Sequence, residues 1–315
     1  MSFSAGSSVI PLASANAYAV GVAIEPLRAT EIFRIGRWRC VVGASESTAV
    51  QSQRWPMISF THVGAFVVHS GARSAVIDPT CTLLINPGSP YRMSRHFGER
   101  SHGAYILVRP DVFAEIAGGE GPGAASGFAE IEGPSSTRSY LLHRSLLDRI
   151  GSDSRPDALE VDEMAMALVE AAFRPSRRPP DAIPRRRQRA RIDRARAVIL
   201  ENFAAPLKLD DIARAVGLSP FHLCRVFRRA TGRTLHQYRT ALRLRIALDR
   251  IVDPEIDLAA LSLELGYSSH SHFTAAFRKE FGVSPSKIRG REKADQFRRL
   301  VRDWPSPPTE VGDSN

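Results

Sequence analysis

The stretch IARAVGLSPFHLCRVFRRATGRTLHQYR, residues 212–239, is repeated in looser form by LSLELGYSSHSHFTAAFRKEFGVSPSKIR, residues 261–289. Gly217 and Gly266 correspond with an offset of 49 residues, and Phe227 and Phe277 with an offset of 50. Each copy contains a short helical pattern, a glycine, a serine and a second helical pattern, which is typical of a helix-turn-helix unit. Two copies are too few for a solenoid. They indicate two helix-turn-helix units on one chain.

The first unit supplies start and stop signals for both of its helices. Asp210 and Asp211 suit the positive N-terminal end of the first helix, and Gly217 suits the left-handed backbone at its end. Ser219 followed by Pro220 is a common helix start. The apolar face of the second helix is expected to be buried and consists of Leu223, Val226, Phe227 and Ala230.

The second unit repeats this logic, and one helix joins the two units. Asp257 is expected to cap its first helix, Gly266 to end it and Ser268 to cap its second helix. Between the units, Leu235 to about Ile251 is predicted to be one helix, roughly 25 Å long at 1.5 Å per residue. Its two apolar stripes can pack against both units. Two recognition helices held about 34 Å apart could then enter successive major grooves of DNA.

The N-terminal half has a different pattern. Residues 30–110 contain short β-branched or aromatic runs separated by turn signals, which favours a small antiparallel barrel or sandwich. The runs are FRIGRWRCVV, MISFTHV, AFVVHSG, SAVI, TLLI and AYILV, and the turns are Ser70-Gly71, Asp78-Pro79 and Asn86-Pro87-Gly88. From about 137 to 173 apolar residues recur at helical spacing. These two helices could pack on the barrel or on a second subunit, and we favour the second subunit.

The charge distribution divides the chain. Residues 1–173 carry a net charge of −3 and residues 174–304 a net charge of +15, as expected when a nucleic-acid-binding domain is joined to another domain. The segment 174–189, RPSRRPPDAIPRRRQR, holds four prolines and seven arginines and is predicted to be an extended linker. The expected units are a loose arm 1–25, a sensor or dimerisation domain 26–173, this linker, a DNA-binding domain 190–300 and a flexible tail 301–315.

Two motifs carry a family resemblance. GLSPFHLCR at 217–225 and GYSSHSHFT at 266–274 resemble the DNA-binding domain of the AraC/XylS family of bacterial transcription regulators. VVHSGARSAVIDPTCTLLINPGSPY, residues 67–91, resembles the cupin-like sensor barrel that many members carry. The resemblance implies a two-domain α+β protein: an antiparallel cupin-like β-barrel with appended helices, then an all-α seven-helix double helix-turn-helix domain.

The resemblance also implies the DNA-contacting positions. They are Phe221, Cys224 and Arg225 in the first recognition helix, and His270, Ser271, His272, Thr274 and Ala275 in the second. An arginine such as Arg225 can bind guanine O6 and N7 with two hydrogen bonds. Ala275 departs from the family, in which arginine is common at that position, so the second helix is expected to rely on its histidines and weaker contacts.

Other chemistries are not favoured. Cys40, Cys81 and Cys224 lack a C-x-x-C spacing, which argues against a disulfide framework or zinc finger. His62, His69, His96 and His102 are scattered, so we predict no metal site and no cofactor. A DNA-repair enzyme, which would need an activated Cys40 or Cys81, or a cupin enzyme fused to this DNA-binding domain is an unfavoured alternative. The other alternative is a constitutive regulator whose barrel only dimerises.

The expected protein is therefore a cytoplasmic DNA-binding regulator and not an enzyme. Its expected partners are double-stranded promoter DNA, a small-molecule effector, RNA polymerase if it is an activator as the family implies, and a second copy in a homodimer. No stretch predicts membrane insertion. The effector-binding residues are unknown, although Trp55, Tyr91, Arg92 and His96 could line a pocket in the barrel.

Overall fold

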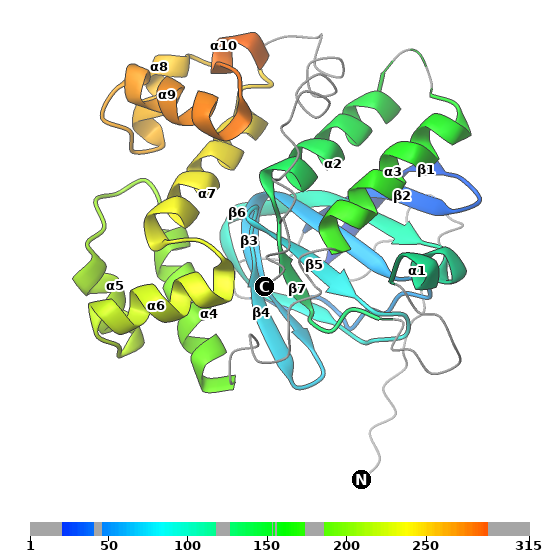
Figure 1. The fold of residues 1–315 in the computed structure, drawn as a ribbon, viewed down its shortest axis with the longest axis horizontal. Helices are drawn as coiled ribbons and strands as arrows, with labels where there is room; N and C mark the ends of the chain where they lie inside the picture. The colour runs from blue at the N-terminus through cyan, green and yellow to red at the C-terminus, as the bar shows by residue number, and fades with distance from the viewer. Residues whose placement is uncertain are drawn as a thin grey trace, which may run out of the picture.

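The computed structural model describes residues 21–40, 46–117, 127–152, 154, 156–173 and 186–288. An antiparallel sheet is followed by helices that cover one of its faces and by a separate helical part (Figure 1). The strands are β1 Val22–Ala29, β2 Phe33–Cys40, β3 Met57–Ser70, β4 Arg73–Ile77, β5 Cys81–Ile85, β6 Arg92–Val108 and β7 Glu132–Pro134. The helices are α1 Pro110–Ala117, α2 Thr137–Ile150, α3 Ala158–Phe173, α4 Arg186–Glu201, α5 Leu209–Val216, α6 Pro220–Thr231, α7 Leu235–Arg250, α8 Leu258–Glu264, α9 His270–Phe281 and α10 Pro285–Ile288.

Two long strands, β3 and β6, organise the sheet. They pair along most of their length, with register shifts between Thr61 and Val67 that mark bulges. The first part of β3 also pairs with β5 and its last part with β4. The runs MISFTHV and AFVVHSG, predicted as separate strands, therefore form the single strand β3. The bulges and the positive φ of Gly64 bend the strand without ending it.

The sheet does not close into a barrel within the described residues. Its order is β1-β2-β6-β3-β5-β7, and β4 pairs with β3 alone, so β1, β7 and β4 are edge strands. The prediction of antiparallel strands is confirmed, but a closed cupin-like barrel is wrong for this part of the chain. β7 is only three residues long, and such a strand offers few backbone groups with which to pair across a closing edge.

Alternation along the strands gives the sheet two buried faces. Ile58 and Phe60 belong to one core and Met57 to the other. The core with Ile58 is completed by α1, α2 and α3, through residues such as Phe113, Leu146 and Leu168. The expectation that α2 and α3 pack on a second subunit is therefore wrong, because their apolar stripes cover their own sheet.

Two predicted boundaries also shift. β1 begins at Val22, inside the segment predicted as a loose arm, because Val22 pairs with Cys40 of β2. α4 begins at Arg186, so the last four residues of the predicted linker form its first turn. The rest of the arm, the Gly-rich loop near residue 120, most of the linker and the tail lie outside the described residues.

The helices from α4 onward form two small cores that meet at α7. Tyr238 and Leu242 of α7 pack in a core with α4, α5 and α6. Leu244 and Leu248 pack in a second core with α8, α9 and α10. The predicted bridging helix with two apolar stripes is confirmed. α4 also lies against β4 and α7 against β3, and no helix of the described chain is long and apolar enough to cross a membrane.

Candidate nucleic-acid interface

The first helix-turn-helix unit consists of α5 and α6. Asp210 and Asp211 lie in the first turn of α5, and Gly217 ends this helix with a left-handed φ of 65°. Ser219 caps α6 by accepting a hydrogen bond from the backbone N–H of His222, and Pro220 is the first residue of the helix. These features confirm the predicted start and stop signals.

α6 buries one face and exposes the other. Leu223 and Phe227 are buried in the core shared with α4, α5 and α7, and Val226 is buried as well. Phe221 lies on the opposite side and is 80% exposed, and Cys224 and Arg225 are exposed with it. A large aromatic side chain has no folding advantage when it is this exposed. Such a residue at the start of a recognition helix is available for contact with bases.

The second unit consists of α8 and α9. Asp257 caps α8 as predicted, but the prediction that Ser268 caps α9 is wrong. Ser269 is the cap and accepts a hydrogen bond from the backbone N–H of His272, whereas the Ser268 hydroxyl lies 3.2 Å from Nδ1 of His272. The turn before α9 is thus one residue longer than the turn before α6.

This longer turn places the two recognition helices in register. α6 begins at Pro220 and α9 at His270, so Phe221, Cys224 and Arg225 occupy the same helical positions as Ser271, Thr274 and Ala275. His270, Ser271, His272 and Ala275 are exposed, and Thr274 is half-buried. All eight predicted contact residues therefore lie on the N-terminal part of α6 or α9, away from the two helical cores.

Arginines on α7 fix the segment that follows α4. Nε of Arg239 and Nε of Arg243 donate to the carbonyl oxygen of Phe203 at 2.8 and 2.6 Å. Gly266 packs at the same place, because a Cβ atom there would lie 2.0 Å from the carbonyl oxygen of Ala204. The end of α4, the helix α7 and the turn after α8 are thus held together at one point.

A buried ionic cluster joins the sheet to the helices α4 and α7. Asp78, in the turn between β4 and β5, accepts hydrogen bonds at Oδ2 from Nη2 of Arg196 at 2.9 Å and from the hydroxyl of Tyr238 at 2.5 Å. Nη1 of Arg196 binds Glu132 of β7 at 2.7 Å. Arg189 binds Glu132 as well, at 3.0 Å. We call Asp78, Glu132, Arg196 and Tyr238 the junction cluster.

The electrostatics of the junction cluster follow from this pairing. Burial by itself raises the pKa of Asp78, but Arg196 and hydrogen bonds from Thr80 and Tyr238 outweigh it and hold the pKa below its ordinary value. The carboxylate is therefore charged and matched by Arg196. Removing one member of a buried pair leaves the other charge without compensation, which is costly.

Further contacts tie the sheet-bearing half to the connecting helix α7 and to the second helix-turn-helix unit. Arg144 of α2 binds Asp249 of α7 at 2.8 Å, and Arg245 of α7 donates to the carbonyl oxygens of Pro79 and Ser135. The hydroxyl of Thr137 at the start of α2 donates to Glu280 of α9 at 2.6 Å. The second recognition helix is thus anchored to the sheet-bearing half directly.

A narrow cavity lies within the sheet-bearing half, on the face opposite α2 and α3. Its volume is about 40 Å³, and its lining is mostly apolar, with Trp38, Met57, Phe66 and Met93 among the lining residues. Tyr91, predicted as a pocket residue, lines this cavity. Trp55 packs beside the same core under Arg34, Arg92 binds Ser47, and the His96 side chain is outside the described part.

Sequence reasoning missed the residues that join the two halves. Asp78 was visible only as part of a turn signal, and Arg196 and Arg245 only as contributors to a basic half. A buried arginine and an exposed arginine give the same signal in a sequence. His62, His102 and Asp249 come from three elements, so their proximity has no sequence signature either.

A helix-turn-helix domain family matches residues 212–291. The regulatory protein SoxS of Salmonella typhimurium is 35% identical over 91 residues, which are 29% of this chain and 85% of SoxS. The Msm operon regulatory protein of Streptococcus mutans is 29% identical over 101 residues, 32% of this chain but only 36% of that protein. Among solved structures, ToxT of Vibrio cholerae O395 aligns with 81% of this chain and 96% of its own, at 12% identity and a TM-score of 0.32.

Proposed function

Because this chain belongs to the AraC/XylS family of DNA-binding transcription regulators, we propose that it binds promoter DNA by inserting α6 and α9 into adjacent major grooves. The observation that carries the proposal is the shared position of the exposed residues on the two helices. Phe221, Cys224 and Arg225 match Ser271, Thr274 and Ala275 turn by turn. Two matched helices on one rigid connector suit two successive turns of one face of DNA.

The two helices would make unequal contributions. Arg225 can bind a guanine with two hydrogen bonds, and Phe221 can contact a thymine methyl group. Ala275 stands where Arg225 stands in the first helix, so the second helix would depend on His270, His272 and Thr274. We therefore propose that the box read by α6 is the more strictly specified of the two.

The test is a selection from random duplex DNA by the full chain at a stated salt concentration. The expected result is an enriched motif with two short boxes about 10 base pairs apart, one better defined than the other. Tight, salt-sensitive binding that enriches no sequence would show a non-specific binder. One box only would show that a single unit reads DNA.

We further propose that the cavity beside Trp38 binds a small effector. Two of the residues that line it, Tyr105 and Gln51, each carry a buried donor without a hydrogen-bond partner in the described chain, the Tyr105 hydroxyl and Nε2 of Gln51. Buried polar groups without partners are costly, and an oxygen acceptor on a ligand could satisfy either donor. The effector class is thus a small, largely apolar molecule with an oxygen acceptor, and Met57 and Met93 would move to admit it.

The same cavity is connected to the junction cluster. Leu83 of β5 lines the cavity, and β5 begins at Cys81, three residues after Asp78. A ligand can shift an arrangement only by binding one state better than another. A shift of β5 would change the pairing of Asp78 with Arg196 and Tyr238, and this supports effector control of DNA binding.

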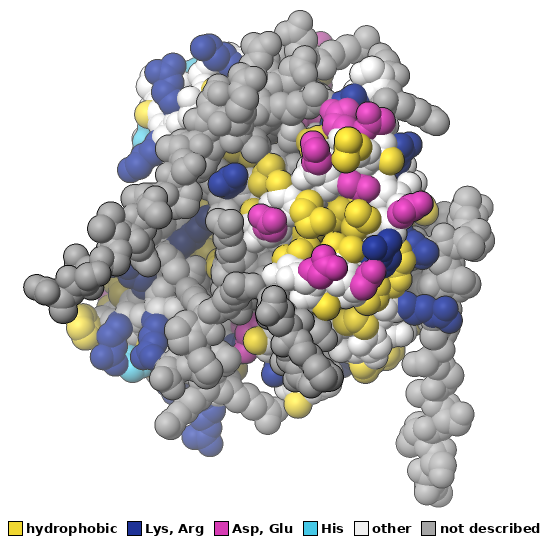
Figure 2. Space-filling model, turned by 45° about the vertical axis from the view of Figure 1, so that its right-hand side comes forward, with side chains coloured by type: hydrophobic (Ala, Val, Ile, Leu, Met, Phe, Trp, Pro, Cys, Tyr) yellow, Lys and Arg dark blue, Asp and Glu magenta, His cyan; other side chains and the backbone are white. Residues whose placement is uncertain are grey.

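Dimerisation and activation complete the proposal. α3 exposes Leu159, which is 68% exposed, and carries five acidic residues on or beside it: Asp157, Glu160, Asp162, Glu163 and Glu170. The side of the molecule brought forward in Figure 2 shows hydrophobic side chains among acidic ones. This surface supports a homodimer contact, and contact with RNA polymerase would make the protein an activator.

The competing proposals have less support. A constitutive regulator would not need unpaired polar groups in a cavity. A thiol-based repair activity would need a reactive cysteine, but Cys40 and Cys81 are buried. Burial and the nearby Asp78 carboxylate raise the pKa of Cys81 far above its ordinary value, which keeps the thiol protonated and unreactive.

A further inference from the structure

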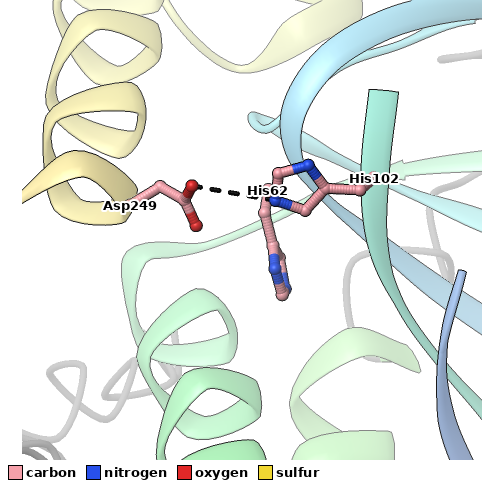
Figure 3. A group of neighbouring side chains, drawn as sticks. All are labelled: His62, His102 and Asp249. Atoms are coloured by element: carbon pink, nitrogen blue, oxygen red, sulfur yellow. Dashed lines mark ion pairs between the residues drawn. The ribbon is translucent and has the colours of Figure 1, made fainter. Parts of the chain in front are cut away.

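We propose that His62, His102 and Asp249 form a binding site for one divalent transition-metal ion, of the zinc type, between the sheet and α7. His62 lies on β3, His102 on β6 and Asp249 on α7. Their ligand atoms all lie within 4.8 Å of one another. Figure 3 shows the Asp249 carboxylate facing the His102 ring, with the His62 ring beside them.

The spacing of His102 and Asp249 suits an ion better than a hydrogen bond. Nε2 of His102 lies 3.7 Å from Oδ2 of Asp249, which is too long for a good hydrogen bond. Two ligand atoms on one tetrahedral zinc ion, each about 2.0–2.1 Å from it, lie about 3.3 Å apart. A movement of a few tenths of an ångström would bring this pair to coordination distance. The ligand atom of His62, which lies within 4.8 Å of the other two, would have to move by up to about 1.5 Å.

The surroundings lower the pKa of both histidines. Burial lowers the pKa of His62 well below its ordinary value, and the positive charge of Arg144 lowers it further. Burial also lowers the pKa of His102, against the opposing effect of Asp249. Two imidazoles and one carboxylate are a common ligand set for late first-row divalent ions.

The surroundings supply the second shell and a path for entry. Nε2 of His62 lies 2.8 Å from Nε2 of His143, so His62 can bind an ion through Nδ1 while donating to His143. Oδ1 of Asp249 is held by Arg144 at 2.8 Å, which leaves Oδ2 for the ion. Fixed orientation of this kind is typical of metal ligands. The three residues line an open cleft of about 900 Å³, which gives an ion access from solvent.

The charges that face the cluster are mixed. Arg37 and Arg39 of β2 and Arg144 of α2 line the cleft, as do Glu25 of β1 and Asp148 of α2. The two β2 arginines are exposed, so water and salt weaken their repulsion of a cation. Arg144 is the strongest opposing charge, and its bond to Asp249 offsets part of that repulsion. The site therefore depends on coordination bonds and not on a general negative field.

An ion bound here would connect the two halves of the molecule. Two ligands belong to the sheet and the third to α7, the helix that joins the two helix-turn-helix units. Because the ion binds only when β3, β6 and α7 are in place, it would stabilise this arrangement by mass action. This inference stands on the side-chain geometry and does not depend on which DNA the protein binds.

The experiment is a titration of the metal-free full chain with Zn²⁺ against a chromophoric chelator, together with Co²⁺ as a spectroscopic probe. We expect one tightly bound ion per chain and a visible absorption band from Co²⁺ bound by nitrogen and oxygen ligands. His102→Ala and Asp249→Asn should each lower the affinity by at least about tenfold, since even second-shell changes cost 10- to 100-fold. Zn²⁺ should raise the Tm of the unchanged protein and not that of His102→Ala.

Matched controls separate this site from adventitious binding. His69 lies on the same strand β3 but binds Ser94 at 2.7 Å, so His69→Ala should bind Zn²⁺ as the unchanged protein does. His270→Ala, on the exposed surface of α9, should do the same. Because His102 is partly exposed, its variant should fold, and circular dichroism checks this. Equal Zn²⁺ affinity in His102→Ala, Asp249→Asn and the unchanged protein would overturn the proposal, as would loss of the site in His270→Ala.

Discussion

The hydroxyl of Tyr238 donates a 2.5 Å hydrogen bond to the carboxylate of Asp78, across the junction between the sheet and the DNA-binding helices. Arg196 binds the same carboxylate oxygen, and both partners are fully buried or nearly so. A single turn residue of the sheet therefore pairs with α4 and α7 together. A change in the position of this turn would therefore alter the contacts of α4 and α7. Because α7 joins the two helix-turn-helix units, the change would reach both of them.

The first prediction concerns this carboxylate. Asp78→Asn removes the charge that faces Arg196 and should lower the free energy of unfolding by about 3 kcal/mol, as expected when one partner of a buried ion pair is lost. Urea unfolding followed by circular dichroism measures the change. Asp111→Asn breaks an exposed pair with Arg109 and should leave the urea midpoint unchanged. Equal midpoints for Asp78→Asn and the unchanged protein would show that the pair contributes nothing.

The second prediction concerns pH. Burial and the neighbouring Glu132 raise the pKa of Asp193, on α4, to about 7, against the opposing effects of Arg196 and Arg189. The folded chain then holds a proton that the unfolded chain, with an ordinary Asp pKa of about 4, has released. The stability contributed by protonated Asp193 is full below about pH 4 and is lost as the pH rises through about 7.

Asp193→Asn removes this dependence. The free energy of unfolding of the unchanged protein, relative to that of the variant, should fall between pH 5 and pH 8. Urea midpoints of both proteins at the two pH values give the difference, which cancels contributions from other groups such as His62. An exposed substitution, Asp210→Asn, serves as the control. A difference that stays constant or rises with pH would contradict the assignment.

Local signals made the C-terminal half largely predictable. Gly217, Ser219 and Pro220 specify the turn between α5 and α6 by their own conformational preferences. The two stripes of α7 follow from helical periodicity, and both cores form as predicted. The cap of α9 was assigned one residue early because Ser268 and Ser269 are both good caps, and only the backbone geometry separates them.

The N-terminal half was predictable only in outline. Strand runs and turns gave the antiparallel sheet, but whether its edges meet depends on pairing between distant strands. β1 was missed because its sequence, VAIEPLRA, contains a proline and two charged residues, which are depleted in strands. The junction cluster and the histidines beside Asp249 were missed because long-range pairing of charged residues leaves no period or motif in a sequence.

The third prediction compares the glycines that end the first helix of each unit. Gly217 and Gly266 have φ values of 65° and 77°, so alanine should cost about 1 kcal/mol at either position for the left-handed backbone. At Gly217 a Cβ atom meets nothing within 4 Å, whereas at Gly266 it lies 2.0 Å from the carbonyl oxygen of Ala204. Gly266→Ala should therefore cost about 1–3 kcal/mol more than Gly217→Ala, as overpacking usually does. Urea unfolding of both variants measures this difference in the free energy of unfolding. Equal destabilisation by the two substitutions would mean that residues 203–205 move aside without loss of stability.

The last prediction separates base reading from phosphate binding on α6. Arg225→Ala should weaken binding to the selected DNA by about 1–3 kcal/mol and relax the preference at one base pair, because an arginine contact to guanine is lost. Phe221→Ala should also weaken specific binding, and the Tm of this variant should match that of the unchanged protein, since Phe221 is exposed and outside the core.

Fluorescence anisotropy at a fixed salt concentration, with the selected duplex and single-base variants, measures the DNA affinity of both variants. Arg214→Ala, exposed on α5, is the matched control and should preserve the base preferences. Arg225→Ala could instead weaken binding equally on every duplex and lower the number of counterions released on binding by about one. Arg225 would then be a phosphate contact, and the proposed guanine contact would be wrong.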